Sequence, residues 1–135
     1  MKDILTMIYQ AITEDEELMS MVSKRNIKFN DYPEVMSITE PYIVIDDFDD
    51  PMPEVYFDGE QEGYSYIVQV DVFVKATDRY NARLKRNAIS QRINKVLWDN
   101  YLMGQVTNLG NEYNKDFALY RSTRRYEAIF YEEEN

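Results

Sequence analysis

The 135-residue sequence contains no cysteine and no histidine. Without cysteine, the chain forms neither a disulfide framework nor thiolate ligands for a metal. Without histidine, it lacks the usual general base near neutral pH and the commonest zinc ligand. Carboxylates remain available for acid–base chemistry or for holding magnesium, but the two absences exclude most hydrolase sites. We therefore predict a protein that is not an enzyme and has no catalytic residues, no cofactor and no metal site.

Long hydrophobic runs are also missing. No stretch approaches the roughly eighteen consecutive apolar residues of a membrane-spanning helix. Residues 1–8 include a short apolar stretch, but acidic residues follow at 14–17 and no small-residue cleavage site is present. We therefore expect no signal peptide and no membrane partner, and a location in the cytoplasm of the cell that makes the protein.

The composition is that of a folded chain. Apolar residues make up 44% of the sequence and aromatic residues 14%, with twelve tyrosines. A chain of this length is expected to form one domain, over residues 1–135, that buries about two-thirds of its unfolded surface. Tyrosine is suited to half-buried strands and contact surfaces, because its ring buries area while its hydroxyl stays in water.

Charge is distributed unevenly along a chain whose net charge is −10. Residues 29–74 contain twelve acidic residues and no basic one, whereas residues 75–95 contain seven basic residues and only Asp78 as an acid. Two interpretations stay open: a solvated domain with one charged helix face, or a self-complementary surface on which the acidic part of one copy meets the basic part of another. The negative total disfavours free nucleic acid as a partner, because neutralisation of phosphate drives such binding.

Hydrophobic periodicity predicts an N-terminal helix over residues 3–12 and one long central helix over residues 78–98. Thr13 and Glu16 fit a capping box that starts a second, short helical segment. The buried stripe of the central helix is expected to comprise Ala82, Ile89, Ile93, Val96 and Leu97.

Runs of β-branched and aromatic residues predict strands at 42–45, 64–75, 105–113 and 119–131, and a further short strand at 27–32. The run 64–75 alternates between an apolar face, which we expect against the helices, and a mixed face suited to solvent or another subunit. The predicted fold class is α+β: a single domain with a mixed or antiparallel sheet of about four strands, packed by an N-terminal helix and one long central helix. Residues 132–135 are expected to be a disordered tail.

Residues 46–63 hold the densest group of acidic residues together with two prolines. Prolines and repelling charges predict an acidic loop or arm. Its carboxylates are ligands of the kind that divalent ions take. The calcium-loop pattern counted from Asp46, however, places Pro51 at the glycine position and Phe57 at the glutamate position. We favour a solvated or interface-forming segment, and cation binding is the alternative.

Arginines concentrate on the predicted central helix and on the final strand. Those of the helix, which we expect on its flanks or outer surface, are Arg79, Arg83, Arg86 and Arg92. Those of the strand are Arg121, Arg124 and Arg125. They form either a nucleic-acid-contacting surface or a solvated face that pairs with the acidic segment. The second interpretation is favoured, since no alternation of aromatic and basic residues accompanies the arginines.

One strand–helix junction carries a family resemblance. It runs from Val68 to Ala82 and begins Val-Gln-Val-Asp-Val-Phe. Together with the order of the predicted elements, it resembles the tail terminator, or tail completion, proteins of long-tailed bacteriophages, in which a strand of the form (I/V)xVDV(F/Y) precedes a helix with small residues. The Leu119-Tyr120-Arg121 sequence at the start of the last predicted strand also matches. The resemblance covers nearly the whole chain, but the segment 46–63 departs from the family pattern.

The resemblance implies a structural protein that caps the tail tube, ends its polymerisation and joins the tail to the head–neck connector. Its partners would be further copies of itself in a ring, expected to be a hexamer, the major tail-tube protein and the connector protein, with DNA only as the genome passing through the lumen. It would be found in the host cytoplasm during assembly and at the tail–neck junction of the virion. The alternatives are another phage neck or capsid-completion subunit, or a nucleic-acid-binding adaptor that uses the basic helix.

A ring places unlike patches of neighbouring subunits against each other, which suits a chain with separate acidic and basic regions. We therefore predict an intersubunit or lumen surface at which acidic residues are faced by arginines across the ring. The predicted acidic residues are Asp46, Asp47, Asp49, Asp50 and Glu54. The predicted arginines are Arg79, Arg83, Arg86, Arg124 and Arg125.

Overall fold

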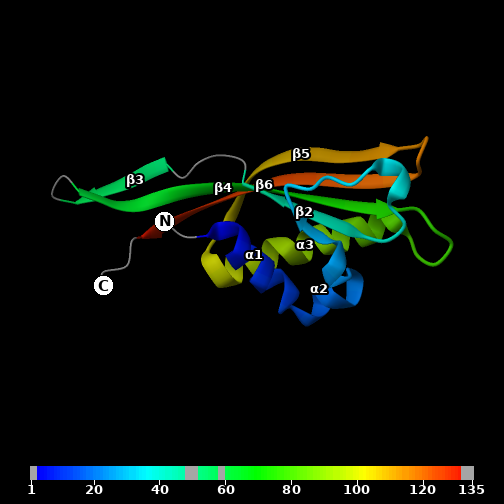
Figure 1. The fold of residues 1–135 in the computed structure, drawn as a ribbon, viewed down its shortest axis with the longest axis horizontal. Coiled ribbons are helices and arrows are strands. Elements are labelled where there is room, and N and C mark those ends of the chain that lie inside the picture. The colour runs from blue at the N-terminus through cyan, green and yellow to red at the C-terminus, as the bar shows by residue number, and fades with distance from the viewer. Residues whose placement is uncertain (1–2, 48–51, 58–59, 132–135) are drawn as a thin grey trace.

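The computed structural model describes residues 3–47, 52–57 and 60–131, with side chains described for 3–47 and 63–130. These residues form one α+β domain in which helices cover one face of a mixed sheet (Figure 1). The predicted fold class is confirmed, although the sheet has six strands rather than about four. Within these ranges no helix is both long enough and apolar enough to cross a membrane. The predicted tail, residues 132–135, lies outside the described residues.

The covering layer consists of α1 (Ile4–Thr13), α2 (Glu16–Met21) and α3 (Ala82–Tyr101). Asp3 caps α1, because its carboxylate accepts a hydrogen bond from the Thr6 N–H at 3.2 Å. Asn81 caps α3 in the same way, with its side-chain oxygen 3.1 Å from the Leu84 nitrogen. The central helix therefore starts at the residue after this asparagine rather than at residue 78, since asparagine is among the strongest N-capping residues.

The second helix also begins at a different residue from the predicted one. Thr13 is the last residue of α1, and its hydroxyl donates to the Tyr9 carbonyl oxygen at 2.8 Å. Asp15 is the N-cap of α2, with its carboxylate accepting from the Leu18 N–H at 3.0 Å. The predicted capping box of Thr13 and Glu16 is therefore wrong, because threonine can bond back into its own helix and aspartate caps at least as well.

The strands are β1 (Ile27–Phe29), β2 (Tyr42–Asp46), β3 (Met52–Phe57), β4 (Glu60–Lys75), β5 (Gly104–Asn114) and β6 (Leu119–Tyr131). Their order is β1-β2-β4-β6-β5, and β3 pairs with part of β4. Strands β1 and β2 are parallel, and the other pairs are antiparallel. At residues 63–65, β4 pairs with β3 on one side and with β6 on the other, so β3 lies along the same edge of β4 as β2.

The acidic segment, defined here as residues 46–63, contains a strand where the sequence predicts a loop or arm. Its β3 part pairs with the start of β4, and this hairpin extends beyond the helical layer (Figure 1). Pro53 is tolerated because β3 lies at a sheet edge and because the register shifts between Pro53 and Val55. The segment is therefore an arm rather than a loop over residues 52–57.

The main core fills the space between the helices and the covered face of the sheet. The alternate β4 residues predicted to face the helices are buried there, and they include Val68, Val70, Val72 and Val74. The predicted α3 stripe of Ala82, Ile89, Ile93, Val96 and Leu97 is buried as well. A smaller apolar cluster on the other face contains Ile38, Val44, Phe73 and Leu119.

Candidate interaction surface

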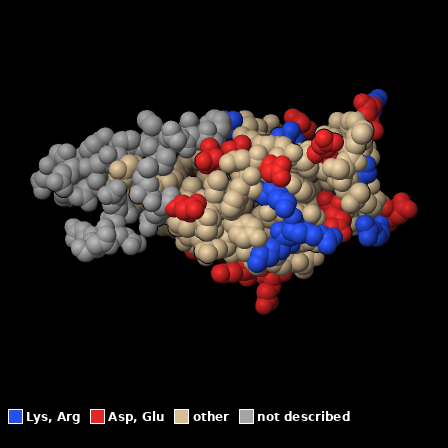
Figure 2. All heavy atoms as spheres, in the orientation of Figure 1, with Lys and Arg blue, Asp and Glu red and all other residues tan. Residues whose placement is uncertain are grey.

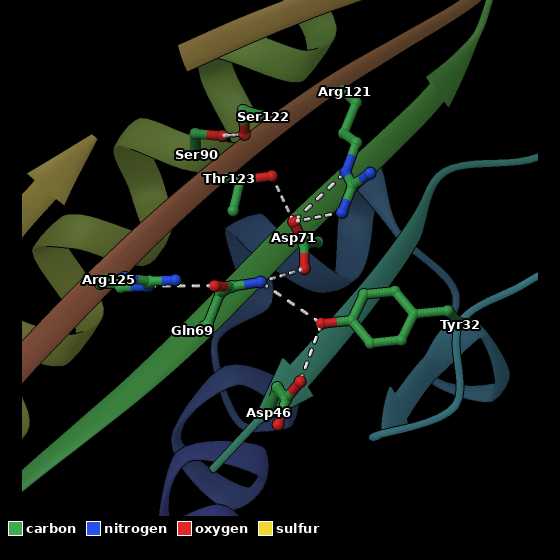
Figure 3. Close-up of polar contacts among 9 residues, drawn as sticks. All are labelled: Tyr32, Asp46, Gln69, Asp71, Ser90, Arg121, Ser122, Thr123 and Arg125. Atoms are coloured by element: carbon green, nitrogen blue, oxygen red, sulfur yellow. Dashed lines mark hydrogen bonds and ion pairs between the residues drawn. The ribbon is translucent and has the colours of Figure 1, made fainter. Parts of the chain in front are cut away.

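A polar cluster lies on the face of the sheet opposite the helices (Figure 3). At its centre is Asp71 of β4, which is 0% exposed although α1, α2 and α3 all pack on the other face. The strand register places Asp71 between Val44 of β2 and Thr123 of β6. Neighbouring strands on both sides therefore supply the side chains that surround this carboxylate.

Three side chains satisfy the Asp71 carboxylate. Arg121 donates to Oδ1 from Nη2 at 3.2 Å and from Nε at 3.3 Å, and the Thr123 hydroxyl donates to the same oxygen. Gln69 Nε2 donates to Oδ2 at 3.1 Å. The guanidinium of Arg121 also lies over the Phe73 ring, 5.0 Å from its centroid. The buried charge is thus paired and both of its oxygens accept hydrogen bonds, which is the condition for burying an ion pair without a large net cost.

Gln69 connects this cluster to two predicted interface residues. Arg125 Nε donates to Gln69 Oε1 at 3.1 Å, and Gln69 Nε2 also donates to the Tyr32 hydroxyl at 3.4 Å. The Tyr32 hydroxyl in turn donates to Asp46 Oδ2 at 2.9 Å. Burial, followed by the negative charge of Asp71, raises the pKa of Tyr32, which keeps its hydroxyl protonated as a donor. Asp46 and Arg125 are therefore linked within one subunit.

The structure describes only part of the other predicted acidic residues. Asp47 is exposed and follows the end of β2. Glu54 is part of β3, but its side chain lies outside the described residues, as do Asp49 and Asp50 entirely. The prediction that these carboxylates form an intersubunit or lumen surface therefore stays a prediction.

Arg86 is only 5% exposed, so the expectation that it lies on a flank or on the outer surface is wrong. Its guanidinium donates to Asn87 Oδ1 at 3.0 and 3.1 Å and to the Glu112 carbonyl oxygen at 3.4 Å. It also lies over the Tyr120 ring, 5.5 Å from the centroid. The physical reason is position, because residue 86 follows Ala82 by four residues and so falls in the stripe that packs on the sheet.

Arg124 lies on the same covered face, between Ser122 and Tyr126, whose hydroxyls bond to α3. Its Nε is buried and has no hydrogen-bond partner within the described part of the chain. Arg83, one turn before Arg86, is exposed. Burial is the largest cause that lowers the pKa of Arg86, and the positive charges of Arg124 and Arg83 add to it. We call Arg83, Arg86 and Arg124 the arginine cluster.

Arg79 is not part of the arginine cluster. It is exposed, precedes α3, and lines a hollow of about 310 Å³ together with Tyr80 and Lys85. The Lys85 ammonium lies over the Tyr80 ring, 4.1 Å from the centroid. Glu40, which also lines the hollow, pairs with Arg25 at 3.0 Å. The predicted arginines are therefore divided between this hollow, the arginine cluster and the uncovered face.

The basic helix is not a continuous basic surface. Arg92 is paired with Asp15 at 2.7 Å and with Glu17 at 3.0 Å, and the Arg92 hydrogen bond holds the pKa of Asp15 below its ordinary value. Lys95 pairs with Asp99 at 3.0 Å. On the face shown in Figure 2, Lys and Arg side chains gather over the helical layer with Asp and Glu side chains close to them.

Sequence reasoning missed Asp71 and its partners as a site. The available signal is an aspartate in the middle of a Val-rich strand, on the same face as Gln69 two residues earlier. Arg121 and Thr123 alternate in the same way on the last strand. Such a pattern predicts a buried ion pair once the two strands are known to be neighbours.

Within the described ranges, no group of three or more acidic side chains is placed to hold a metal ion. Comparison with known protein families and with curated proteins gives no match. Function is therefore inferred from the geometry above and from the resemblance carried by Val68–Ala82.

Proposed function

We propose that this chain is a structural subunit of the tail-terminator type, which caps a bacteriophage tail tube as a ring and joins the tail to the head–neck connector. The proposal combines the family resemblance with an α+β fold that has the element order on which the resemblance depends. It assigns no chemistry to the chain. Its partners are further copies of itself, the tail-tube protein and the connector protein.

The observation that carries the proposal is the separation of the acidic segment from the arginine cluster. Of the described parts of the acidic segment, Asp46 ends β2, residues 52–57 form β3 and residues 60–63 begin β4, whereas Arg124 is on β6 and Arg86 contacts β5. Asp46 is on the uncovered face, and Arg124 is on the covered one. Strand β4 stands between the strand of Asp46 (β2) and the strand of Arg124 (β6), so these two side chains are kept apart within one subunit. Unlike surfaces at opposite edges suit head-to-tail contacts, which close into a ring when the rotation between neighbours allows it.

The buried polar groups support a structural role. Asp71 is held by Arg121 and is 0% exposed, so its carboxylate does not reach a substrate from this position. The hydroxyls of Ser90 and Ser122 lie 2.6 Å apart and satisfy each other in the core. These groups fix the register of α3, β4 and β6 rather than face an open cleft.

Deletion of the gene from the phage that carries it tests the proposal. We expect overlong tubes or tails without heads in electron micrographs, and normal tails when the wild-type chain is supplied in trans. Tails of normal length that fail to join heads would indicate a neck subunit instead. Infectious particles with normal tails would overturn the proposal.

A nucleic-acid-binding adaptor is tested by the salt dependence of DNA binding. The net charge of −10 and the pairing of Arg92 with Asp15 and Glu17 disfavour binding to the phosphate backbone of DNA. We therefore expect no measurable DNA binding at low salt, where phosphate contacts are strongest. Tight binding that weakens steeply with added salt would favour the adaptor.

A further inference from the structure

The arginine cluster comprises three positive charges that have no carboxylate partner in the described part of the chain. Within the described residues, no Asp or Glu oxygen lies within ion-pair distance of Arg83, Arg86 or Arg124. The nearest acidic residue along β5 is Glu112, but only its backbone carbonyl accepts from Arg86. Glu112 stands opposite Arg121 in the strand register, which directs its side chain to the uncovered face. Among the residues whose side chains are described, the cluster is therefore uncompensated.

Burial makes this lack of an anion costly. Arg86 is 5% exposed, and its partners are an amide oxygen, a carbonyl oxygen and an aromatic ring, all of which are neutral. The buried Nε of Arg124 has no hydrogen-bond partner in the described part of the chain. The buried Arg86 is repelled by the like charges of the half-buried Arg124 and the exposed Arg83, and a bound anion removes that repulsion. The contrast with Asp71 and Arg121 is direct, since that buried pair carries its own counter-charge.

We propose that the arginine cluster is an anion-binding site that receives carboxylates from the acidic segment of a second copy of this chain. Guanidinium groups bind carboxylates with paired, charge-assisted hydrogen bonds, which identifies the chemistry of the ligand. The choice of a second copy follows from charge complementarity, because residues 46–62 of the same sequence carry eight acidic residues and no basic one. This inference rests on the head-to-tail contact in the proposed function.

The described strands place the two ends of the proposed contact apart within one subunit. Asp46 ends β2, and β3 shares an edge of β4 with β2. Arg124 is on β6, beyond the opposite edge of β4, and Arg86 reaches as far as β5. Two copies placed head to tail bring the acidic edge of one to the arginine cluster of the next.

Arg83→Glu is the variant that tests the site, because Arg83 is exposed and its replacement leaves the packing of the core unchanged. Lys95→Glu is the matched control: it lies on the exposed part of the same helix, makes the same change in net charge and interrupts only a surface pair with Asp99. Arg124→Gln is the second test variant, since it removes a charge without reversing it. Circular dichroism melting identifies any variant that has lost its fold.

The measurement is sedimentation velocity of the full chain over a concentration series at low salt. We expect the wild type and Lys95→Glu to self-associate, and Arg83→Glu to weaken the association constant at least about tenfold, as like-charge contacts do. Arg124→Gln is expected to weaken it less. A folded Arg83→Glu that associates as strongly as Lys95→Glu would overturn the inference while leaving the tail-length test of the proposed function intact.

Competition with inorganic phosphate tests two claims separately: that the anion-binding site exists, and that a second copy of the chain occupies it. We expect millimolar phosphate to compete with self-association of the wild type more strongly than chloride of equal ionic strength, and to leave Arg83→Glu unaffected. A wild type that binds phosphate at the cluster but stays monomeric would overturn the second copy as the occupant. A wild type that stays monomeric and does not bind phosphate would overturn the anion site itself.

Discussion

The two faces of the sheet differ in how they accommodate buried charged side chains. The covered face is apolar, with alternate valines of β4 packed under α3, but beside β5 it carries the uncompensated arginine cluster. The opposite face has a fully buried aspartate, Asp71, whose charge is matched by Arg121 on the next strand. The comparison shows that charge in this protein is balanced where the subunit is complete by itself. It is unbalanced where we propose that another subunit is needed.

The largest effect on stability is expected at Asp71, whose charge is paired within the subunit. Asp71→Ala leaves the Arg121 guanidinium, the Thr123 hydroxyl and the Gln69 amide without their acceptor. We predict a loss of about 3–5 kcal/mol in the free energy of unfolding, measured by urea denaturation. The double variant Asp71→Leu/Arg121→Met should lose less than Asp71→Ala, because neither charge is left unpaired. A loss below about 1 kcal/mol for Asp71→Ala would show that the network contributes little.

The stability of the apolar core under α3 should depend on side-chain volume rather than on charge. Ile89 is 0% exposed and lies in the stripe of α3 that packs on the sheet. Ile89→Ala should cost about 2–5 kcal/mol through lost burial and a cavity, whereas Ile89→Val should cost only about 1 kcal/mol. Thermal unfolding of both variants checks the ordering. Equal losses would mean that the site collapses around the smaller side chain.

The Asp15–Arg92 pair should make stability depend on pH. The hydrogen bond from Arg92 is the main cause that lowers the pKa of Asp15 from its ordinary value of 3.8. A depressed pKa in the folded state adds stability that is present above that ordinary value and is lost as the pH falls through the folded pKa. Asp15→Asn should therefore cost about 1–2 kcal/mol at pH 7 and less as the pH falls below about 4, since Asn still caps α2.

Urea denaturation of both proteins between pH 7 and pH 3 measures this difference. Arg92→Gln serves as the control because it removes the other member of the Asp15–Arg92 pair. Its loss in the free energy of unfolding should shrink over the same pH range. A difference that stays constant as the pH falls would contradict the assignment of the pKa shift to Arg92.

The smallest effect is expected at the rim of the polar cluster. Tyr32→Phe removes the hydroxyl that connects Gln69 to Asp46, at a position that is 40% exposed. We predict a loss of about 0.5–1 kcal/mol by urea denaturation, because water replaces the missing donor. A loss as large as that of Asp71→Ala would mean that the rim and the centre of the cluster form one cooperative unit.

Much of the fold follows from local sequence patterns. The alternation of β4 and the helical stripe of α3 predict the covered face correctly, because periodicity alone determines which side chains share a face. Helix starts are predicted less well, since Thr13, Asp15 and Asn81 are all capable caps and only the packing of the helices selects among them. Strand β3 is missed because its pairing with β4 is a tertiary interaction that overrides the proline signal.

The candidate site shows the same limit. Local charge counts predict an acidic region and a basic one, but they do not reveal that Arg86 is buried or that Arg124 joins it from another strand. Asp46 and Arg125 are likewise predicted from charge, and their connection through Gln69 and Tyr32 depends on strand order. Contacts of this kind, between residues far apart in the sequence, follow only from the register of the sheet.

The central claim is that unlike edges of two copies meet head to tail. It is tested most directly by native mass spectrometry of two complementary variants: Arg83→Glu, which has an intact acidic segment, and the triple variant Asp47→Lys/Asp49→Lys/Asp50→Lys, which has an intact arginine cluster. We predict that each alone is a monomer of about 16 kDa and that their mixture forms a heterodimer that does not grow further, because only one good interface remains. A mixture that contains only monomers, or homodimers of either variant, would contradict the claim.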